Sequence, residues 1–264
     1  MRNLLAVAVF SLFTFISGCT DVITYANKSR EEGLRLYNER AIADAAGAFR
    51  NAIRQDPRDY QSQFYLGVCY DDLNQHHQAF SQFHISLDVM TQLGRNYYDP
   101  EFRQRVLDAY GASIARHDQN DSEINALEKR AAAGTKGEEW FILAKAFRIR
   151  GDADRAIDSY NRAARAAGDD FNIRREFGLY LLDPLNQTKE AEYWLRQASR
   201  LNSHDDAVNA ALEKLGVNPQ QAARARQPGE RLTPPPREAV VIPTTPTAQP
   251  LVAPIKGSVQ LPRD

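Results

Sequence analysis

The sequence repeats itself at an interval of 34 residues, which restricts the fold more than any other feature of the chain. Small residues recur at this interval, since Gly33 is followed by Gly67 and Ala45 by Ala79. Further along the chain, a second set of residues falls at consistent spacings: Trp140, Leu143, Phe147, Ala156, Tyr160 and Ala163. A repeat of this length predicts supersecondary units that cannot bury their own apolar faces and therefore stack on one another.

These residues resemble the tetratricopeptide repeat, a helix-turn-helix unit of the same period. The resemblance covers roughly residues 26–203 and implies an all-α solenoid of about five repeats. Residues 26–59, 60–93 and 137–170 are the clearest repeats, the third repeat is degenerate, and the fifth has an extra residue in its turn. An apolar stripe in residues 204–215 predicts a C-terminal capping helix, so we expect one folded domain over residues 26–216.

The first residues have the pattern of an export signal. Met1 and Arg2 precede an uncharged stretch, residues 4–16, which is shorter than the roughly 20 residues that a membrane-spanning helix needs. The sequence Ile16-Ser17-Gly18-Cys19 resembles the lipobox of bacterial lipoproteins. This resemblance implies a signal peptide at residues 1–18 and a lipidated linker at residues 19–25, with acylated Cys19 attaching the chain to the bilayer. A plain secretory signal is the alternative.

The identity of Thr20 bears on location, because in lipoproteins a residue other than Asp at this place implies transfer to the outer membrane of a Gram-negative cell. We therefore expect the protein on the periplasmic face of the outer membrane. Cys69, the other cysteine, lies in a helical pattern between Val68 and Tyr70. It is interpreted as a small buried hydrophobe instead of a reactive thiol.

The C-terminal segment differs in composition from the rest. Ten of the 13 prolines lie within residues 217–264, and no aromatic residue follows Trp194. Such a segment has few large apolar groups to offset the entropy of ordering, so we predict a disordered proline-rich tail. It is interpreted as a linker or as a segment that another protein binds.

The tetratricopeptide resemblance also implies a concave groove lined by the first helix of each repeat. The residues that the resemblance assigns to this groove are Arg30, Leu34, Tyr37, Phe64, Tyr65, Val68, Phe141, Lys145, Arg148 and Arg175. Their mixture of aromatic and basic side chains predicts binding to other envelope proteins or peptide segments. For Phe64 and Tyr65, packing between helices is an equally weighted alternative.

The densest group of potential metal ligands comprises His76, His77 and His84 together with Asp71 and Asp72. His76 and His77 fall in a predicted turn. We therefore interpret the group as a solvated loop together with one helical histidine whose hydrogen bonds are satisfied. We expect neither a metal nor another cofactor.

No nucleophile elbow, phosphate loop or redox pair is found, so we predict that the protein is not an enzyme and has no small-molecule substrate. The net charge of −1 argues against nucleic-acid binding. The sequence favours a membrane-anchored interaction scaffold or assembly adaptor of the cell envelope. A pilotin-like factor for a pilus or secretion pore and a peripheral envelope metalloenzyme are the alternatives.

Overall fold

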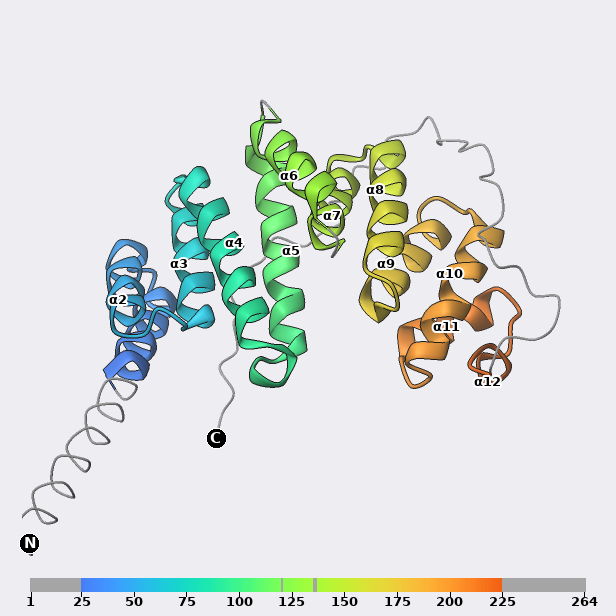
Figure 1. The fold of residues 1–264 in the computed structure, drawn as a ribbon, viewed down its shortest axis with the longest axis horizontal. Helices are drawn as coiled ribbons and strands as arrows, with labels where there is room; N and C mark the ends of the chain where they lie inside the picture. The colour runs from blue at the N-terminus through green and yellow to red at the C-terminus, as the bar shows by residue number, and fades with distance from the viewer. Residues whose placement is uncertain (1–24, 120, 135–136, 225–264) are drawn as a thin grey trace, which may run out of the picture. The chain divides into compact units, whose positions relative to one another are not determined.

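A computed structural model describes residues 25–119, 121–134 and 137–224, which are helical apart from turns and short connections (Figure 1). The described part of the chain contains no strand, so the prediction of an all-α fold is confirmed. The predicted signal peptide, Cys19 and most of the predicted tail lie outside the described residues. No helix among the described residues is both long enough and apolar enough to cross a membrane.

The described residues form two compact units, and the chain passes from one to the other between Glu123 and Ile124. The N-terminal unit contains a first helix over residues 25–38, followed by α2 (Ile42–Gln55), α3 (Tyr60–Asp72), α4 (His76–Leu93), the short η1 (Arg95–Tyr97) and α5 (Pro100–His117). The C-terminal unit contains α7 (Glu138–Arg150), α8 (Ala153–Ala166), α9 (Phe171–Leu182), α10 (Thr188–Leu201), α11 (Asp206–Lys214) and α12 (Pro219–Ala222). Helix α6 (Ser122–Ala133) begins at the boundary between the units.

The repeated glycines allow the two helices of a hairpin to pack closely. A Cβ atom added to Gly33 would lie 2.7 Å from the ring of Phe49, and one added to Gly67 would lie 2.8 Å from the ring of Phe83. In the C-terminal unit, a Cβ atom at Gly178 would lie 2.8 Å from Leu195. Real Cβ atoms do not approach other heavy atoms so closely, so a larger residue at these positions would force the helices apart. This geometry is the physical reason for the 34-residue pattern.

Aromatic rings fill the space between successive hairpins. In the N-terminal unit, Phe64 of α3 contacts Phe102 of α5 at a centroid distance of 5.2 Å. In the C-terminal unit, Tyr160 of α8 stacks on Phe177 of α9 at 5.1 Å, and Phe177 contacts Trp194 of α10 at 5.2 Å. Each unit therefore has a continuous core along the direction in which its own helices stack.

The C-terminal unit ends in the capping helix that the apolar stripe predicts. Helix α11 packs against α9 and α10, and Val208 and Leu212 are fully buried there. The short α12 follows Gly216, within the segment predicted as tail, and it buries Ala222 against the preceding helices. The structure therefore describes ordered residues up to Arg224, and residues 225–264 lie outside it.

Candidate functional site

The first helix of each repeat carries most of the residues that the resemblance assigns to a partner-binding groove. In the N-terminal unit, the Oη atom of Tyr37 donates a hydrogen bond of 2.9 Å to Asp72 at the end of α3. Leu34 lies one helical turn before Tyr37, and Val68 lies one turn before Asp72. The bond therefore brings the two helix faces side by side. We call Leu34, Tyr37 and Val68 the apolar strip, and all three are half-buried.

Two aromatic residues predicted for the groove belong instead to the core. Phe64 and Tyr65 are each only 7% exposed. Tyr65 stacks on Phe49 at a centroid distance of 5.5 Å, and Phe64 contacts both Tyr65 and Phe102. Of the two alternatives left open for this pair, packing between helices is confirmed. The reason is that α5 covers this part of α3.

Phe141 is the third aromatic residue that the structure moves from the groove to the core. Its ring is buried in α7 against Tyr160 of α8, at a centroid distance of 6.0 Å. Lys145, one turn further along α7, is only 1% exposed. Its ammonium lies 4.3 Å from the ring centroid of Phe141 and pairs with Glu176 of α9. Neither residue is available to a partner on the surface.

The remaining basic groove residues are engaged within the protein. Arg148 lies 3.8 Å from the same Glu176 carboxylate that pairs with Lys145. Arg175 of α9 forms an ion pair of 3.0 Å with Asp205, the residue that caps α11. In the N-terminal unit, Arg30 contacts Asp59 at 2.9 Å, and Asp59 caps α3. A carboxylate from the same unit, in or just before the next helix but one, therefore compensates the charge of each of these three cations.

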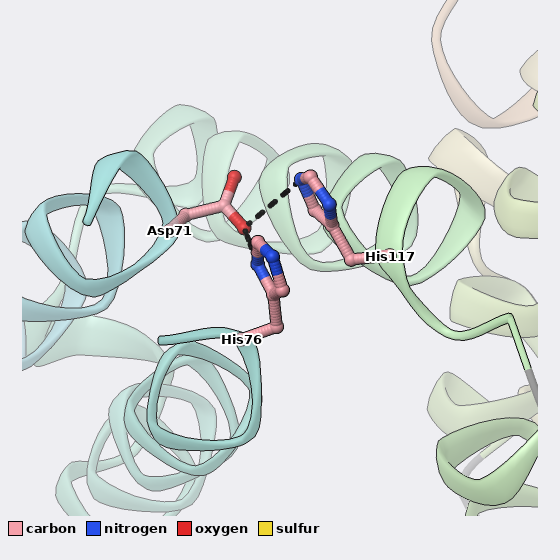
Figure 2. A group of neighbouring side chains, drawn as sticks. All are labelled: Asp71, His76 and His117. Atoms are coloured by element: carbon pink, nitrogen blue, oxygen red, sulfur yellow. Dashed lines mark ion pairs between the residues drawn. The ribbon is translucent and has the colours of Figure 1, made fainter. Parts of the chain in front are cut away.

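A polar cluster lies beside the turn between α3 and α4. It consists of Asp71 near the end of α3, His76 at the start of α4 and His117 at the end of α5 (Figure 2). The Oδ1 atom of Asp71 lies 3.5 Å from Nδ1 of His76 and 3.7 Å from Nε2 of His117. The two imidazole rings stack almost in parallel, with centroids 3.6 Å apart and planes inclined by 8°. We call these three residues the His–Asp cluster.

Two residues of α5 hold the carboxylate of the His–Asp cluster. The hydroxyl of Ser113 donates a hydrogen bond to Oδ1 of Asp71, and the Nη2 atom of Arg116 lies 2.9 Å from Oδ2. Burial, together with the nearby His76 and Arg116, holds the pKa of His117 below its ordinary value, whereas the negative charge of Asp71 opposes this shift. The neutral imidazole is therefore favoured at neutral pH.

A pocket of about 390 Å³ opens beside the cluster. Besides His76 and His117, polar residues line it, including Asn74 in the α3–α4 turn, Gln78 in the first turn of α4 and Gln119 just after α5. The pocket belongs entirely to the N-terminal unit. It gives the two imidazoles access to solvent on one side.

The composition of the cluster differs from that of the group seen in the sequence. Asp71 and His76 belong to both, but His84 lies two turns further along α4 and faces Asp88, at 3.4 Å. His77 contacts the ring of Phe80 instead. His117 is absent from the group seen in the sequence because it lies far from His76 along the chain, at the end of α5, and only the fold brings the two imidazoles together.

Cys69 is fully buried in α3 and forms no disulfide with any residue that the structure describes. Burial raises the pKa of its thiol to about 12, with a smaller contribution from the charge of Asp72. The thiol therefore stays protonated at physiological pH, which agrees with the interpretation of Cys69 as a small hydrophobe.

The helical hairpins, the glycine contacts between their helices and the capping helix define a fold of the tetratricopeptide-repeat type. No protein-family model and no curated protein matches the sequence. Among solved structures, residues 41 to the end of MamA from Desulfovibrio magneticus RS-1 are 17% identical, with 69% of this chain and 97% of that chain covered and a TM-score of 0.36. YrrB, a TPR protein with an unusual peptide-binding site, is 12% identical, with 70% and 90% covered and a TM-score of 0.37. At these values, neither protein informs the function of this chain.

Proposed function

We propose that this protein is a non-catalytic interaction scaffold, or assembly adaptor, of the cell envelope. The observation that carries the proposal is the apolar strip on the first helices of the N-terminal unit. Leu34, Tyr37 and Val68 are only half-buried there, whereas Phe64 and Tyr65 of α3 are packed in the core. Apolar side chains that are only half-buried on neighbouring helices favour a segment of another protein as ligand.

The charges around the strip support recognition through apolar contacts. Asp72 already accepts the hydrogen bond from Tyr37, and Arg30 is bound to Asp59. A partner therefore gains little from ion pairs at these positions. Its apolar side chains would contribute about 25 cal/mol for each Å² of apolar surface removed from water. The partner that fits this surface is an apolar helix or extended segment of another envelope protein.

Substitution of the strip tests this function. The double variant L34E/V68E places two charges on the strip and should abolish recovery of the partner in a crosslinked pull-down from membranes. The control is I53E, which changes a half-buried isoleucine on α2, the second helix of its hairpin. Circular dichroism should show the same helix content for all three proteins. Equal recovery of the partner by the wild type and the double variant would place the interface elsewhere.

We further propose that acylated Cys19 anchors the scaffold to the periplasmic face of the outer membrane. The uncharged stretch followed by Ile16-Ser17-Gly18-Cys19 supports this part of the proposal. Each buried methylene of an acyl chain adds about 0.8 kcal/mol of membrane affinity, so several chains would give stable attachment. The variant C19S should be found in the soluble periplasmic fraction, whereas the wild type sediments with outer membranes. Sedimentation of C19S with membranes would contradict lipid anchoring at this residue.

A further inference from the structure

The His–Asp cluster presents three potential ligand atoms to one point in space. One nitrogen of His76, one nitrogen of His117 and one oxygen of Asp71 all lie within 4.8 Å of one another. Ligands in a tetrahedral zinc shell with bonds of about 2.1 Å are about 3.4 Å apart. The separations of 3.5 and 3.7 Å between the Asp71 oxygen and the two histidine nitrogens are close to this value.

A second observation comes from the hydrogen bonding of His76. Its Nδ1 atom is buried from solvent and has no hydrogen-bond partner among the described residues. A buried polar atom without a partner costs free energy, and nearly all such atoms in folded proteins find a donor, an acceptor or an ion. Of the two histidine nitrogens that face Asp71, this atom is the nearer one. From these two observations we propose that Asp71, His76 and His117 bind a divalent transition-metal ion, with Zn²⁺ as the best fit.

The ligand chemistry selects the class of ion. Two imidazoles and one carboxylate suit Zn²⁺ and related first-row ions, whereas Mg²⁺ and Ca²⁺ prefer oxygen ligands. The pocket beside the cluster is open to solvent and lined by polar side chains, so water can complete the coordination shell. The site is therefore of the open kind, with three protein ligands.

The surrounding residues act on the carboxylate in opposite ways. Ser113 donates to the same oxygen that faces the histidines and fixes the orientation of Asp71, as residues around metal ligands commonly do. Arg116 pairs with the other oxygen and places a positive charge beside the site. We expect Arg116 to weaken the affinity for the cation without preventing its binding.

Binding requires one local movement. In parallel stacked rings, the lone pairs of the two nitrogens lie in separate planes, so both cannot point at one ion. Rotation of one ring about its Cβ–Cγ bond removes this restriction. His76 is the first residue of α4 and His117 is the last residue of α5, and both side chains are about one-quarter exposed, which leaves room for the rotation. The bound ion would then connect α3, α4 and α5.

The experiment uses the untagged full-length chain, stripped of metal with a chelator and titrated with ZnCl₂ by isothermal calorimetry. The wild type should bind one equivalent of Zn²⁺. The variants H76A and H117A should each weaken binding at least about tenfold. The control H84A removes a histidine from the same helix, α4, at a position that pairs with Asp88 outside the cluster. It should bind Zn²⁺ as the wild type does.

A fourth variant separates this site from any other histidine site on the surface. R116A removes the competing charge beside Asp71 and should strengthen Zn²⁺ binding, whereas binding elsewhere would not respond. Circular dichroism in the presence of chelator checks that each variant is folded. If a histidine variant is not folded, Co²⁺ absorption spectra of the wild type and D71N provide the same test. Absence of equimolar binding, equal loss in H84A, or no response to R116A would overturn the proposal.

Discussion

Single glycines determine how closely the helices of a hairpin approach. At Gly67 a methyl group has no room, since its carbon would lie 2.8 Å from the ring of Phe83, whereas nothing lies within 4 Å of a Cβ atom at Gly47 in the middle of α2. The same substitution should therefore have opposite effects at the two positions.

We expect G67A to lower the free energy of unfolding by about 1–3 kcal/mol, because overpacking shifts Phe83 or the helix. G47A should raise it by about 0.5–1 kcal/mol, because alanine favours the helix. Urea unfolding followed by circular dichroism measures both changes. Equal effects at the two positions would show that the close contact at Gly67 is unimportant.

The buried thiol of Cys69 leads to a prediction on pH. Its pKa in the folded protein is about 12, so the thiol should react with disulfide reagents at pH 8 only slowly until denaturant is added. An unfolded chain loses this proton near pH 9, earlier than the folded protein does. Ionisation of Cys69 therefore destabilises the fold as pH rises above 9. Thiol labelling of C19S, which retains only Cys69, measures the reactivity, and rapid labelling without denaturant would contradict it.

At the scale of helices, ion pairs connect one first helix to the next within each unit. The pairs in Arg30–Asp59, Lys145–Glu176 and Arg175–Asp205 are 29, 31 and 30 residues apart. A cation on the first helix of one hairpin thus pairs with a carboxylate of the following hairpin. That carboxylate lies in the first helix of the following hairpin or just before it. In a repeat sequence, an acidic residue at this distance after a basic one therefore indicates that the basic residue is paired within the protein and does not bind a ligand.

The pair formed by Lys145 and Glu176 should contribute strongly to the C-terminal unit. E176Q removes the negative charge opposite a buried ammonium, so we expect it to lower the free energy of unfolding by about 3 kcal/mol. D158N removes the partner of Arg162 in an exposed ion pair on α8. This variant should change the free energy of unfolding by less than about 0.5 kcal/mol. Thermal unfolding compares the two variants, and a cost for E176Q as small as that for D158N would be inconsistent with a buried pair.

The helices and their pairing were predictable because the repeat pattern fixes the small and large residues of each hairpin. The positions of Gly33, Phe49 and Gly67 follow directly from that pattern. The groove was less predictable, since burial of Phe64 depends on Phe102 in α5, a helix of the degenerate repeat. Contacts of this kind depend on how much of one helix the following hairpin covers. The repeat pattern in the sequence does not contain this information.

For the whole molecule, the predicted groove cations are paired with carboxylates of the protein itself. This pairing implies that the affinity for a partner depends little on salt concentration. Screening at high ionic strength weakens ion pairs between exposed charges, whereas apolar contacts persist. We therefore expect the affinity for the proposed partner to change by less than about tenfold between 50 and 500 mM NaCl. Binding measured by surface plasmon resonance over this range tests the expectation, and a steep loss of affinity would indicate that cations of the surface bind the partner.

Asp59 and Asp205 each make two kinds of contact. Asp59 accepts the amide of Ser62 at the start of α3 and also binds Arg30 of the preceding first helix. Asp205 likewise accepts the amide of Val208 at the start of α11 and binds Arg175 of α9. One carboxylate thus both starts a helix and joins it to its neighbour. Neighbouring hairpins should for this reason lose their order together, so that fraying at one end of a unit propagates inward instead of stopping at a single repeat.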